Sequence, residues 1–291
     1  MKALAFGEIL WDIIDGQPHL GGAPFNVAAH LAQLGNNAFI LSAVGNDDLG
    51  QQAIHQAAKL GVNPSLIYRL NDYPTGQVDV FLEGGQPDYT IQEEVAWDYI
   101  PYAPDQDAAK EAWDTLIFGS LALRTEHNIG ALTQVMAHNT FNQVFYDINL
   151  RKDYFSGELF EAGFSLCSIL KVNDEEVGVV SELLFNSPPD EKLFCQQVSE
   201  AYGIDVILIT QGAKGALAYS NQHFFQAKAK PIQVADTVGA GDSFSAAFLH
   251  TYHRTGNVQR ALDNATKMGG FVASRSGAIP TYSHELKTLF S

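Results

Sequence analysis

Short runs of β-branched and apolar residues alternate with longer amphipathic segments along most of the chain. Such alternation is typical of βαβ units, in which helices cover the two faces of a parallel sheet. The apolar runs predict strands over residues 2–7, 38–44, 115–119, 143–148, 168–172, 206–210 and 216–219. The amphipathic segments predict helices over residues 24–34, 49–60, 126–138, 174–184, 190–202, 241–254 and 258–274. We therefore expect an α/β fold around a mostly parallel sheet.

Two segments interrupt this rhythm. Residues 12–20 form a polar insertion after the first strand, and residues 75–91 alternate between apolar and polar positions around a turn at 83–86. Alternation on both sides of a Gly-Gly turn is typical of a β-hairpin. The two segments, bounded at about 12–20 and 73–98, predict a small β-sheet within a single domain of residues 1–291. Decorated surface loops would give a similar pattern.

Composition limits the classes of protein to which the chain can belong. Its 291 residues are 46% hydrophobic and 17% charged, which is ordinary for a globular α/β domain. A formal charge of −16 argues against nucleic-acid and anionic-membrane partners. The sequence lacks the apolar run of roughly 18 residues that a membrane span needs. It also lacks a signal-peptide pattern, so we expect a cytoplasmic protein.

The two cysteines, Cys167 and Cys195, both lie in apolar segments without metal-ligand spacing. We therefore expect them to be buried thiols in a reducing compartment.

Candidate chemistry is concentrated in residues 236–244. Gly239, Ala240 and Gly241 precede Asp242 at the start of a predicted helix. Small side chains there allow an anion to approach the N–H groups at the positive end of the helix dipole. A carboxylate would repel a phosphate at this place unless it accepts the proton of a hydroxyl that attacks the phosphate. Asp242 is therefore a candidate general base, and the alternative is an ordinary junction at which it complements the dipole.

Two earlier loops carry groups that suit a sugar and a metal ion. Gly22 and Asn26 open the helix predicted at 24–34, and an amide can both donate to and accept from sugar hydroxyls. Asn173 and Glu176 follow the strand predicted at 168–172, at an edge where α/β sheets bind ligands. One amide and one carboxylate can hold hydrated Mg²⁺. The alternatives are a turn with a cap in the first case and a capped helix in the second.

A further glycine-rich loop follows the strand predicted at 206–210. Thr210, Gly212 and Gly215 are close to Lys214, and their N–H groups could form a nest around phosphates. The loop does not match the Gly-Lys-Ser/Thr pattern of a Walker A sequence. A plain hairpin turn would fit it equally well.

In this order, the four elements resemble the ribokinase-like (PfkB) carbohydrate kinase family. The resemblance spans essentially the whole chain and implies a ribokinase-like fold with a small β-sheet lid. It also implies phosphoryl transfer from ATP to a sugar. The matching residues are 21–28 with Gly35 and Gly45, 173–176, 210–215, and 236–242 with 246–248.

The resemblance implies a role for each matching position. It makes Asp242 the catalytic base, with Gly239, Ala240 and Gly241 in the anion hole. Implied sugar contacts are Asp12, Gly22, Asn26 and Arg151. Implied nucleotide contacts are Asn173, Thr210, Gly212, Gly215, Asn264 and Met268. The resemblance also implies that Asn173 and Glu176 hold Mg²⁺ through water. Many members bind K⁺ as well, and the matching positions are Asp236, Val238, Ala273 and Gly277.

Within the family, the chain resembles the fructokinase branch at residues 7–12, 96–98, 118–122 and 147–151. Ala23 and Pro24 replace the Lys and Gly of ribokinases, which argues against ribose. We expect D-fructose as the substrate and D-fructose 6-phosphate as the product. Residues 147–151 also resemble 2-keto-3-deoxygluconate kinases and aminoimidazole riboside kinases.

Other functions remain open at this stage. The same chemistry could act on 2-keto-3-deoxygluconate, tagatose or a riboside, and a carboxylated substrate would call on Arg124 and Arg151. A non-catalytic sugar or nucleotide sensor, or a structural scaffold, would need the same fold without turnover. Because lids in this family often mediate dimers, we also expect a homodimer.

Overall fold

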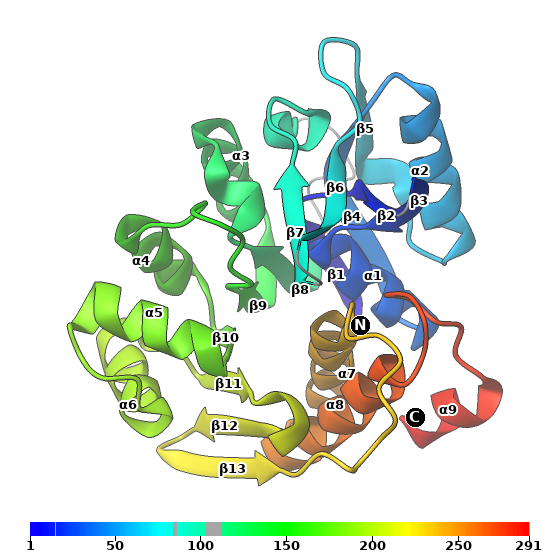
Figure 1. Cartoon of the computed structure of the whole chain (residues 1–291). Coiled ribbons are helices and arrows are strands. Elements are labelled where there is room, and N and C mark those ends of the chain that lie inside the picture. The colour runs from blue at the N-terminus through cyan, green and yellow to red at the C-terminus, as the bar shows by residue number, and fades with distance from the viewer. Residues whose placement is uncertain (15, 84–85, 103–111, 291) are drawn as a thin grey trace.

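The computed structural model describes residues 1–14, 16–83, 86–102 and 112–290 and contains a large and a small β-sheet with surrounding helices (Figure 1). Within these residues, the large sheet has nine strands. In spatial order they are β13 (His223–Ala227), β12 (Ala216–Ser220), β11 (Val206–Thr210), β10 (Ile169–Asn173), β9 (Thr140–Asp147), β8 (Ala112–Gly119), β1 (Lys2–Phe6), β4 (Asn37–Gly45) and β5 (Ile67–Leu70). From β11 to β5 all neighbours pair in parallel, whereas β12 and β13 are antiparallel. The predicted mostly parallel sheet is confirmed.

Helices cover both faces of the large sheet. They are α1 (Ala23–Gln33), α2 (Asp48–Lys59), α3 (Glu126–His138), α4 (Gly157–Leu166), α5 (Asp174–Phe185), α6 (Glu191–Tyr202), α7 (Ala240–Thr255), α8 (Val258–Ala273) and α9 (His284–Leu289). Successive side chains of a strand point to opposite faces. Accordingly, Ala3 and Ala5 of β1 join a core with α1, α7 and α8, while Leu4 and Phe6 join a second core with α3 to α6.

Among the strands and α-helices of the described residues, four were missed by the sequence pattern. The edge strands β5 and β13 and the helices α4 and α9 have short or mixed apolar runs, because each is only partly buried. The predicted core strands and helices all form, with ends that differ by at most three residues.

The small sheet is built from β2 (Leu10–Ile14), β3 (Gln17–Gly21), β6 (Gln77–Glu83) and β7 (Gln86–Ile91), in the order β3-β2-β6-β7. β3 pairs antiparallel with β2, β2 pairs parallel with β6, and β6 pairs antiparallel with β7. The predicted insertion and hairpin therefore combine in one sheet. Gly84 and Gly85 of the predicted turn lie outside the described residues.

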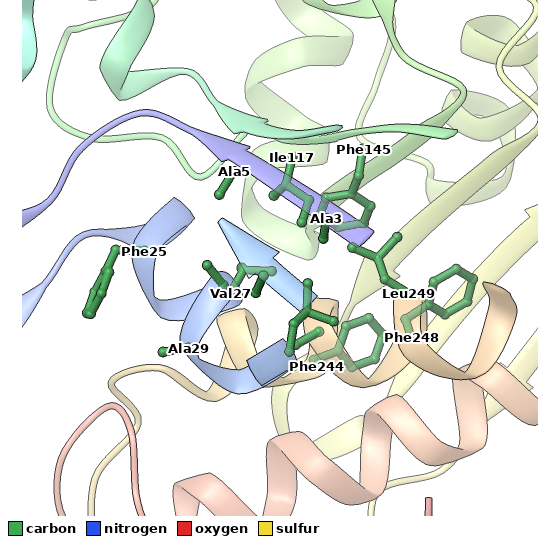
Figure 2. Close-up of a cluster of buried hydrophobic side chains, with 14 of the residues drawn as sticks. Ala3, Ala5, Phe25, Val27, Ala29, Ile117, Phe145, Phe244, Phe248 and Leu249 are labelled. Atoms are coloured by element: carbon green, nitrogen blue, oxygen red, sulfur yellow. The ribbon is translucent and has the colours of Figure 1, made fainter. Parts of the chain in front are cut away.

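The core between α1, α7 and the sheet fixes the direction of α7 (Figure 2). Phe244, Phe248 and Leu249 of α7 are buried in the same cluster as Phe25 of α1 and Phe145 of β9. This packing orients the start of α7 toward the carboxyl ends of the parallel strands. Open α/β sheets bind their ligands at that edge.

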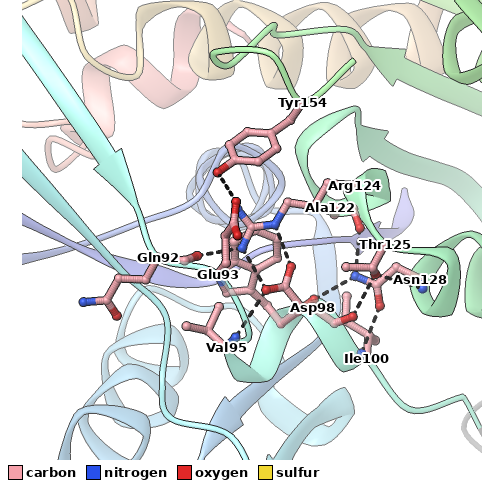
Figure 3. Close-up of polar contacts among 11 residues, drawn as sticks. Gln92, Glu93, Val95, Asp98, Ile100, Ala122, Arg124, Thr125, Asn128 and Tyr154 are labelled. Carbon is pink, nitrogen blue, oxygen red and sulfur yellow. Dashed lines mark hydrogen bonds and ion pairs between the residues drawn. The ribbon is translucent and has the colours of Figure 1, made fainter. Parts of the chain in front are cut away.

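A buried ion pair ties the segment after the small sheet to the main body (Figure 3). Asp98 lies in the 3₁₀ helix η2 (Ala96–Tyr99), and Arg124 lies in η4 (Leu121–Arg124). The guanidinium donates from Nε to Oδ1 at 2.7 Å and from Nη2 to Oδ2 at 2.8 Å, with side chains 5% and 2% exposed. It also lies 4.1 Å from the ring centroid of Trp97.

Cys167 and Cys195 are buried free thiols, as predicted. Burial raises the pKa of both thiols, which makes them poor nucleophiles at neutral pH. In the part of the chain that the structure describes, none of the helices combines the length and apolarity needed to span a membrane.

Candidate active site

The residues predicted to form an anion hole lie at the N-terminus of α7. Gly239 caps the helix with φ +75°, and a Cβ there would lie 2.4 Å from the carbonyl oxygen of Ala278. Only glycine therefore permits this approach of the two backbones. The first four N–H groups of a helix have no intrahelical acceptor. That of Ala240 donates to the Thr237 carbonyl at 3.2 Å, so the N–H groups of Gly241 and Asp242 are the main candidates for an anion.

Asp242 is half-buried in the first turn of α7. Desolvation raises its pKa to about 6, against the hydrogen bond from Asn26 and the positive charges of Lys171 and Arg151. Asn26 of α1 donates from Nδ2 to Oδ2 of Asp242 at 2.8 Å, and its own Oδ1 is buried without a partner among the described atoms. A carboxylate whose pKa lies close to neutral pH suits general-base catalysis.

Two more carboxyl groups with raised pKa belong to the same site. Burial raises the pKa of Glu8 to about 7, and desolvation raises that of Asp12 on β2 to about 6. Glu8 accepts the N–H of Ala23 at 3.1 Å through Oε1, while its buried Oε2 has no partner among the described atoms. The charge of Arg151 acts on Glu8, Asp12 and Asp242 alike, lowering the pKa of each. The structure thus brings three predicted site residues, Asp12, Arg151 and Asp242, into one electrostatic environment.

Gly22, in the predicted sugar site, lies where the loop before α1 passes close to Glu8. Gly22 has φ +110°, and a Cβ there would lie 2.3 Å from the carbonyl oxygen of Glu8. The backbone of Gly22 therefore lies directly against that of Glu8, two residues after the end of β1. The sequence pattern did not assign a role to Glu8, although it lies in the fructokinase-like segment 7–12.

A buried ion pair that the pattern also missed lies beside Asp242. Nζ of Lys171 donates to Oδ1 and Oδ2 of Asp147 at 2.8 and 2.9 Å, and each side chain is 7% exposed. A Cβ on Gly241 would lie 3.4 Å from the same Nζ. A lysine between the apolar residues Leu170 and Val172 of β10 was the signal that could have identified it.

The predicted Mg²⁺ element forms a reciprocal helix cap at the start of α5. Oδ1 of Asn173 accepts the N–H of Glu176, and Oε2 of Glu176 accepts the N–H of Asn173, both at 2.8 Å. Oε1 of Glu176 accepts the N–H of Leu150 at 2.8 Å. The structure therefore contains the cap that was the alternative interpretation. Each oxygen keeps a second lone pair, which suits contact with metal-bound water rather than direct ligation. Within the described ranges, no cluster of three or more His, Cys, Asp or Glu side chains could hold a metal.

The predicted phosphate loop lies next to this element. Thr210 of β11 pairs with Asn173 of β10 in the sheet register. Gly212, at the start of η5 (Gly212–Lys214), has φ +53° and open space where a side chain would be. A Cβ on Gly215 would lie 2.0 Å from the carbonyl oxygen of Ala227, so the end of this loop requires glycine. The three predicted loop residues are therefore together at the carboxyl edge of the sheet.

The two predicted adenine contacts on α8 are largely enclosed. Asn264 is 9% exposed and donates to Oγ1 of Thr251 at 3.2 Å. Met268 is fully buried in an apolar cluster with Val272 and Tyr282. The side chain of Met268 therefore presents no free surface in this structure, and its contact with adenine stays a prediction.

The residues predicted to hold K⁺ are close together. Oδ1 of Asp236 accepts the N–H of Val238 at 3.0 Å, and Oδ2 accepts that of Gly277 at 3.2 Å. The N–H of Asp236 donates to the Ala273 carbonyl at 3.3 Å. The loop before α7 and the segment after α8 are thus joined around one carboxylate, and binding of K⁺ there stays a prediction.

Comparisons with known proteins cover nearly the whole chain. A model of the pfkB family of carbohydrate kinases matches residues 6–285. A fructokinase of Salmonella typhimurium is 28% identical over 288 residues, which cover 93% of this chain and 91% of that protein. An aminoimidazole riboside kinase of the same species is 25% identical over 287 residues, which cover 93% and 88%.

Solved structures agree with the fold. The crystal structure of fructokinase from Xylella fastidiosa with bound ATP has a TM-score of 0.87 at 20% identity, covering 99% of this chain and 97% of that one. A fructokinase from Vibrio cholerae, with fructose, ADP and calcium bound, has a TM-score of 0.83 at 20% identity, covering 100% and 99%. The ribokinase-like fold with a small additional sheet is confirmed.

Proposed function

The chain belongs to the pfkB family of carbohydrate kinases, and we propose that within this family it phosphorylates D-fructose at O6. As a member it is an ATP-dependent sugar kinase. The identity to the Salmonella fructokinase supports fructose, as does the Vibrio fructokinase structure that holds fructose and ADP. The riboside kinase at 25% identity makes a riboside the second candidate.

The negative charge of the proposed sugar site is the observation that favours a neutral sugar. Glu8, Asp12 and Asp242 would all repel the carboxylate of 2-keto-3-deoxygluconate. One of the two cations that could have compensated, Arg124, is buried in its ion pair with Asp98. Hydroxyl groups, in contrast, can donate to carboxylates and to the unpartnered oxygen of Asn26.

In the reaction, the primary hydroxyl oxygen forms a bond to the γ-phosphorus of ATP while the bond to the β,γ-bridging oxygen breaks and ADP leaves. Asp242 accepts the hydroxyl proton, and Asn26 orients the accepting carboxylate through its bond to Oδ2. The N–H groups at the start of α7 bind the oxygens of the transferred phosphoryl group. General-base assistance of this kind is worth about 10²–10⁴-fold in rate.

Mg²⁺, when bound with ATP, neutralises charge on the phosphates. Asn173 and Glu176 would hold its water shell, and Thr210, Gly212 and Gly215 would line the nucleotide, with Asn264 and Met268 toward the adenine. K⁺ would bind near Asp236 and the backbone of Val238, Ala273 and Gly277.

Glu176→Gln tests the metal assignment. The substitution keeps one acceptor oxygen for the N–H of Asn173, but it removes the acceptor of the Leu150 N–H and the negative charge that attracts metal-bound water. We expect the Mg²⁺ concentration for half-maximal rate to rise by roughly 10–100-fold. The control is Glu175→Gln, the same chemical change at an exposed neighbour on the same helix turn. Equal Mg²⁺ dependence in the two variants would contradict the assignment.

The small sheet is proposed as a lid over the sugar and as the site of a homodimer. Ile14, at the end of β2, is 39% exposed and would be available for a contact with the partner subunit. Light scattering at micromolar concentration should give the mass of a dimer, and a monomeric mass would refute it. Cytoplasmic location stays a proposal, to which buried free thiols are suited.

The substrate is tested by ADP release from ATP and Mg²⁺ with D-fructose, D-tagatose, D-ribose, aminoimidazole riboside and 2-keto-3-deoxygluconate. The proposal expects the highest kcat/KM with fructose. A higher value with the riboside would keep the chemistry and replace the sugar. ATP and sugar binding without ADP release would instead indicate a sensor.

A further inference from the structure

The Lys171–Asp147 ion pair places two charges in the middle of the large sheet, where burial is energetically unfavourable. Both side chains are 7% exposed, and the flanking residues of β10, Leu170 and Val172, are fully buried and apolar. Burying two charges costs desolvation energy that their attraction often fails to recover. Apolar residues of similar volume would commonly be as stable or more stable. The pair therefore calls for an explanation other than stability.

Contacts connect this pair to the first turn of α7. Oγ of Ser245, one turn after Gly241, lies 3.0 Å from the Gly241 carbonyl oxygen and 3.4 Å from Oδ2 of Asp147. Nζ of Lys171 lies against Gly241 itself, 3.4 Å from where a Cβ would be. The carboxylate of Asp147 thus accepts two hydrogen bonds from Lys171 and also contacts Ser245 of α7.

The charged groups around Asp242 come from several elements. Asn26 of α1 donates to its carboxylate, and Lys171 of β10 and Arg151 after β9 favour its ionised form. Asp147 of β9 opposes ionisation, and Asp242 and Glu8 repel one another. Arg151 is exposed, whereas Lys171 is fixed beneath the helix. Although burial opposes it, the charges of Asp147 and Glu176 raise the pKa of Lys171, so it is a cation at neutral pH.

We propose that Lys171, held in place by Asp147, is a positioning residue that keeps the carboxylate of Asp242 ionised and supports the first turn of α7. The inference rests on the proposed role of Asp242 as the base. It assigns opposite effects to the two members of the pair. Loss of the lysine removes a cation and favours protonated Asp242. Asp147→Asn, in contrast, keeps one acceptor oxygen for Nζ of Lys171 but removes an anion, so it favours the ionised form.

The test is the acid limb of the kcat/KM profile between about pH 5 and 8, measured with the sugar that is turned over fastest. Lys171→Met should move the limb to higher pH by about one unit, and Asp147→Asn should move it to lower pH. Ser245→Ala perturbs the same contacts without changing charge and should leave the limb in place. A purely structural pair would lower the rate in both charge variants without moving the limb in opposite directions.

A second readout needs no substrate. Ionised Asp242 destabilises the folded state, and Asp242→Asn removes this charge. The free energy of unfolding of the variant therefore exceeds that of the parent by an amount that grows as pH rises to the folded pKa of Asp242 and then levels off. In the Lys171→Met background this growth should continue to higher pH, and in the Asp147→Asn background it should end at lower pH. If no sugar is phosphorylated, the proposed function fails while this comparison still decides the inference.

Either of two results overturns the inference: shifts in the same direction, or no shift in either variant. Should Lys171→Met fail to fold, Asp147→Asn decides alone. A limb at lower pH then supports the inference, and an unchanged or higher one contradicts it.

Discussion

Asp242→Asn should lower kcat by roughly 10²–10⁴-fold while the Kd for the sugar changes little. Asparagine keeps the shape of the side chain and the contact with Asn26 but cannot accept the hydroxyl proton. Steady-state ADP release and equilibrium binding of the sugar measure the two quantities separately. A variant that retains more than about a tenth of the wild-type rate would show that Asp242 is not the base.

The same variant should be more stable than the wild type at neutral pH. The pKa of Asp242 in the folded protein, about 6, lies above its ordinary value of 3.8. Its ionised form is therefore disfavoured by folding, and the associated stability is present below about pH 4 and lost as pH rises through about 6. At pH 7 the substitution should raise the free energy of unfolding by up to about 3 kcal/mol.

Asp48→Asn is the matched control, since Asp48 is an exposed acid in the first turn of α2. There the carboxylate only complements the helix dipole, so its loss should cost about 0.3–1 kcal/mol. Urea unfolding at pH 5 and pH 7 distinguishes the two behaviours. Equal losses in both variants would assign Asp242 the dipole role.

Asp98→Ala should lower the free energy of unfolding by about 3–5 kcal/mol. The substitution removes the counter-ion of Arg124, whose contact with Asp98 is drawn in Figure 3, and leaves the guanidinium buried against Trp97. Val95 also loses the acceptor of its N–H. Because this cluster joins the segment after β7 to the body, the small sheet should also become more susceptible to proteolysis.

Removing both charges provides the control. Asp98→Ala combined with Arg124→Met takes the unpaired cation away, and we expect it to recover much of the lost stability. Urea unfolding of the two single variants and the double variant measures the coupling between the residues. A loss below about 1 kcal/mol in Asp98→Ala would mean that the pair behaves like an exposed one.

The local pattern of the sequence was sufficient for most of the fold. Strands such as β1 and β11 are buried on both faces, so most of their residues form continuous apolar runs that can be recognised without the structure. β13 lies at an edge of the sheet and alternates between exposed and buried positions over only five residues, too short a signal to separate from a loop.

The candidate site was predictable only where its parts are local in sequence. The residues at the start of α7 and the cap formed by Asn173 and Glu176 each belong to one short segment. Asn26 and Asp242, in contrast, are 216 positions apart, and their hydrogen bond depends on how α1 and α7 pack on the sheet. The contact of Lys171 with Asp147 likewise depends on β9 and β10 being neighbours, which a single sequence does not reveal.

The central claim is that the protein transfers the γ-phosphoryl group of ATP to O6 of fructose. The most direct test is to incubate the wild type with ATP, Mg²⁺ and D-fructose and to identify the product by ¹³C and ³¹P NMR. We predict a phosphate ester on carbon 6, formed in equal amount to ADP. An ester on another carbon, ADP without an ester, or no reaction would contradict the claim.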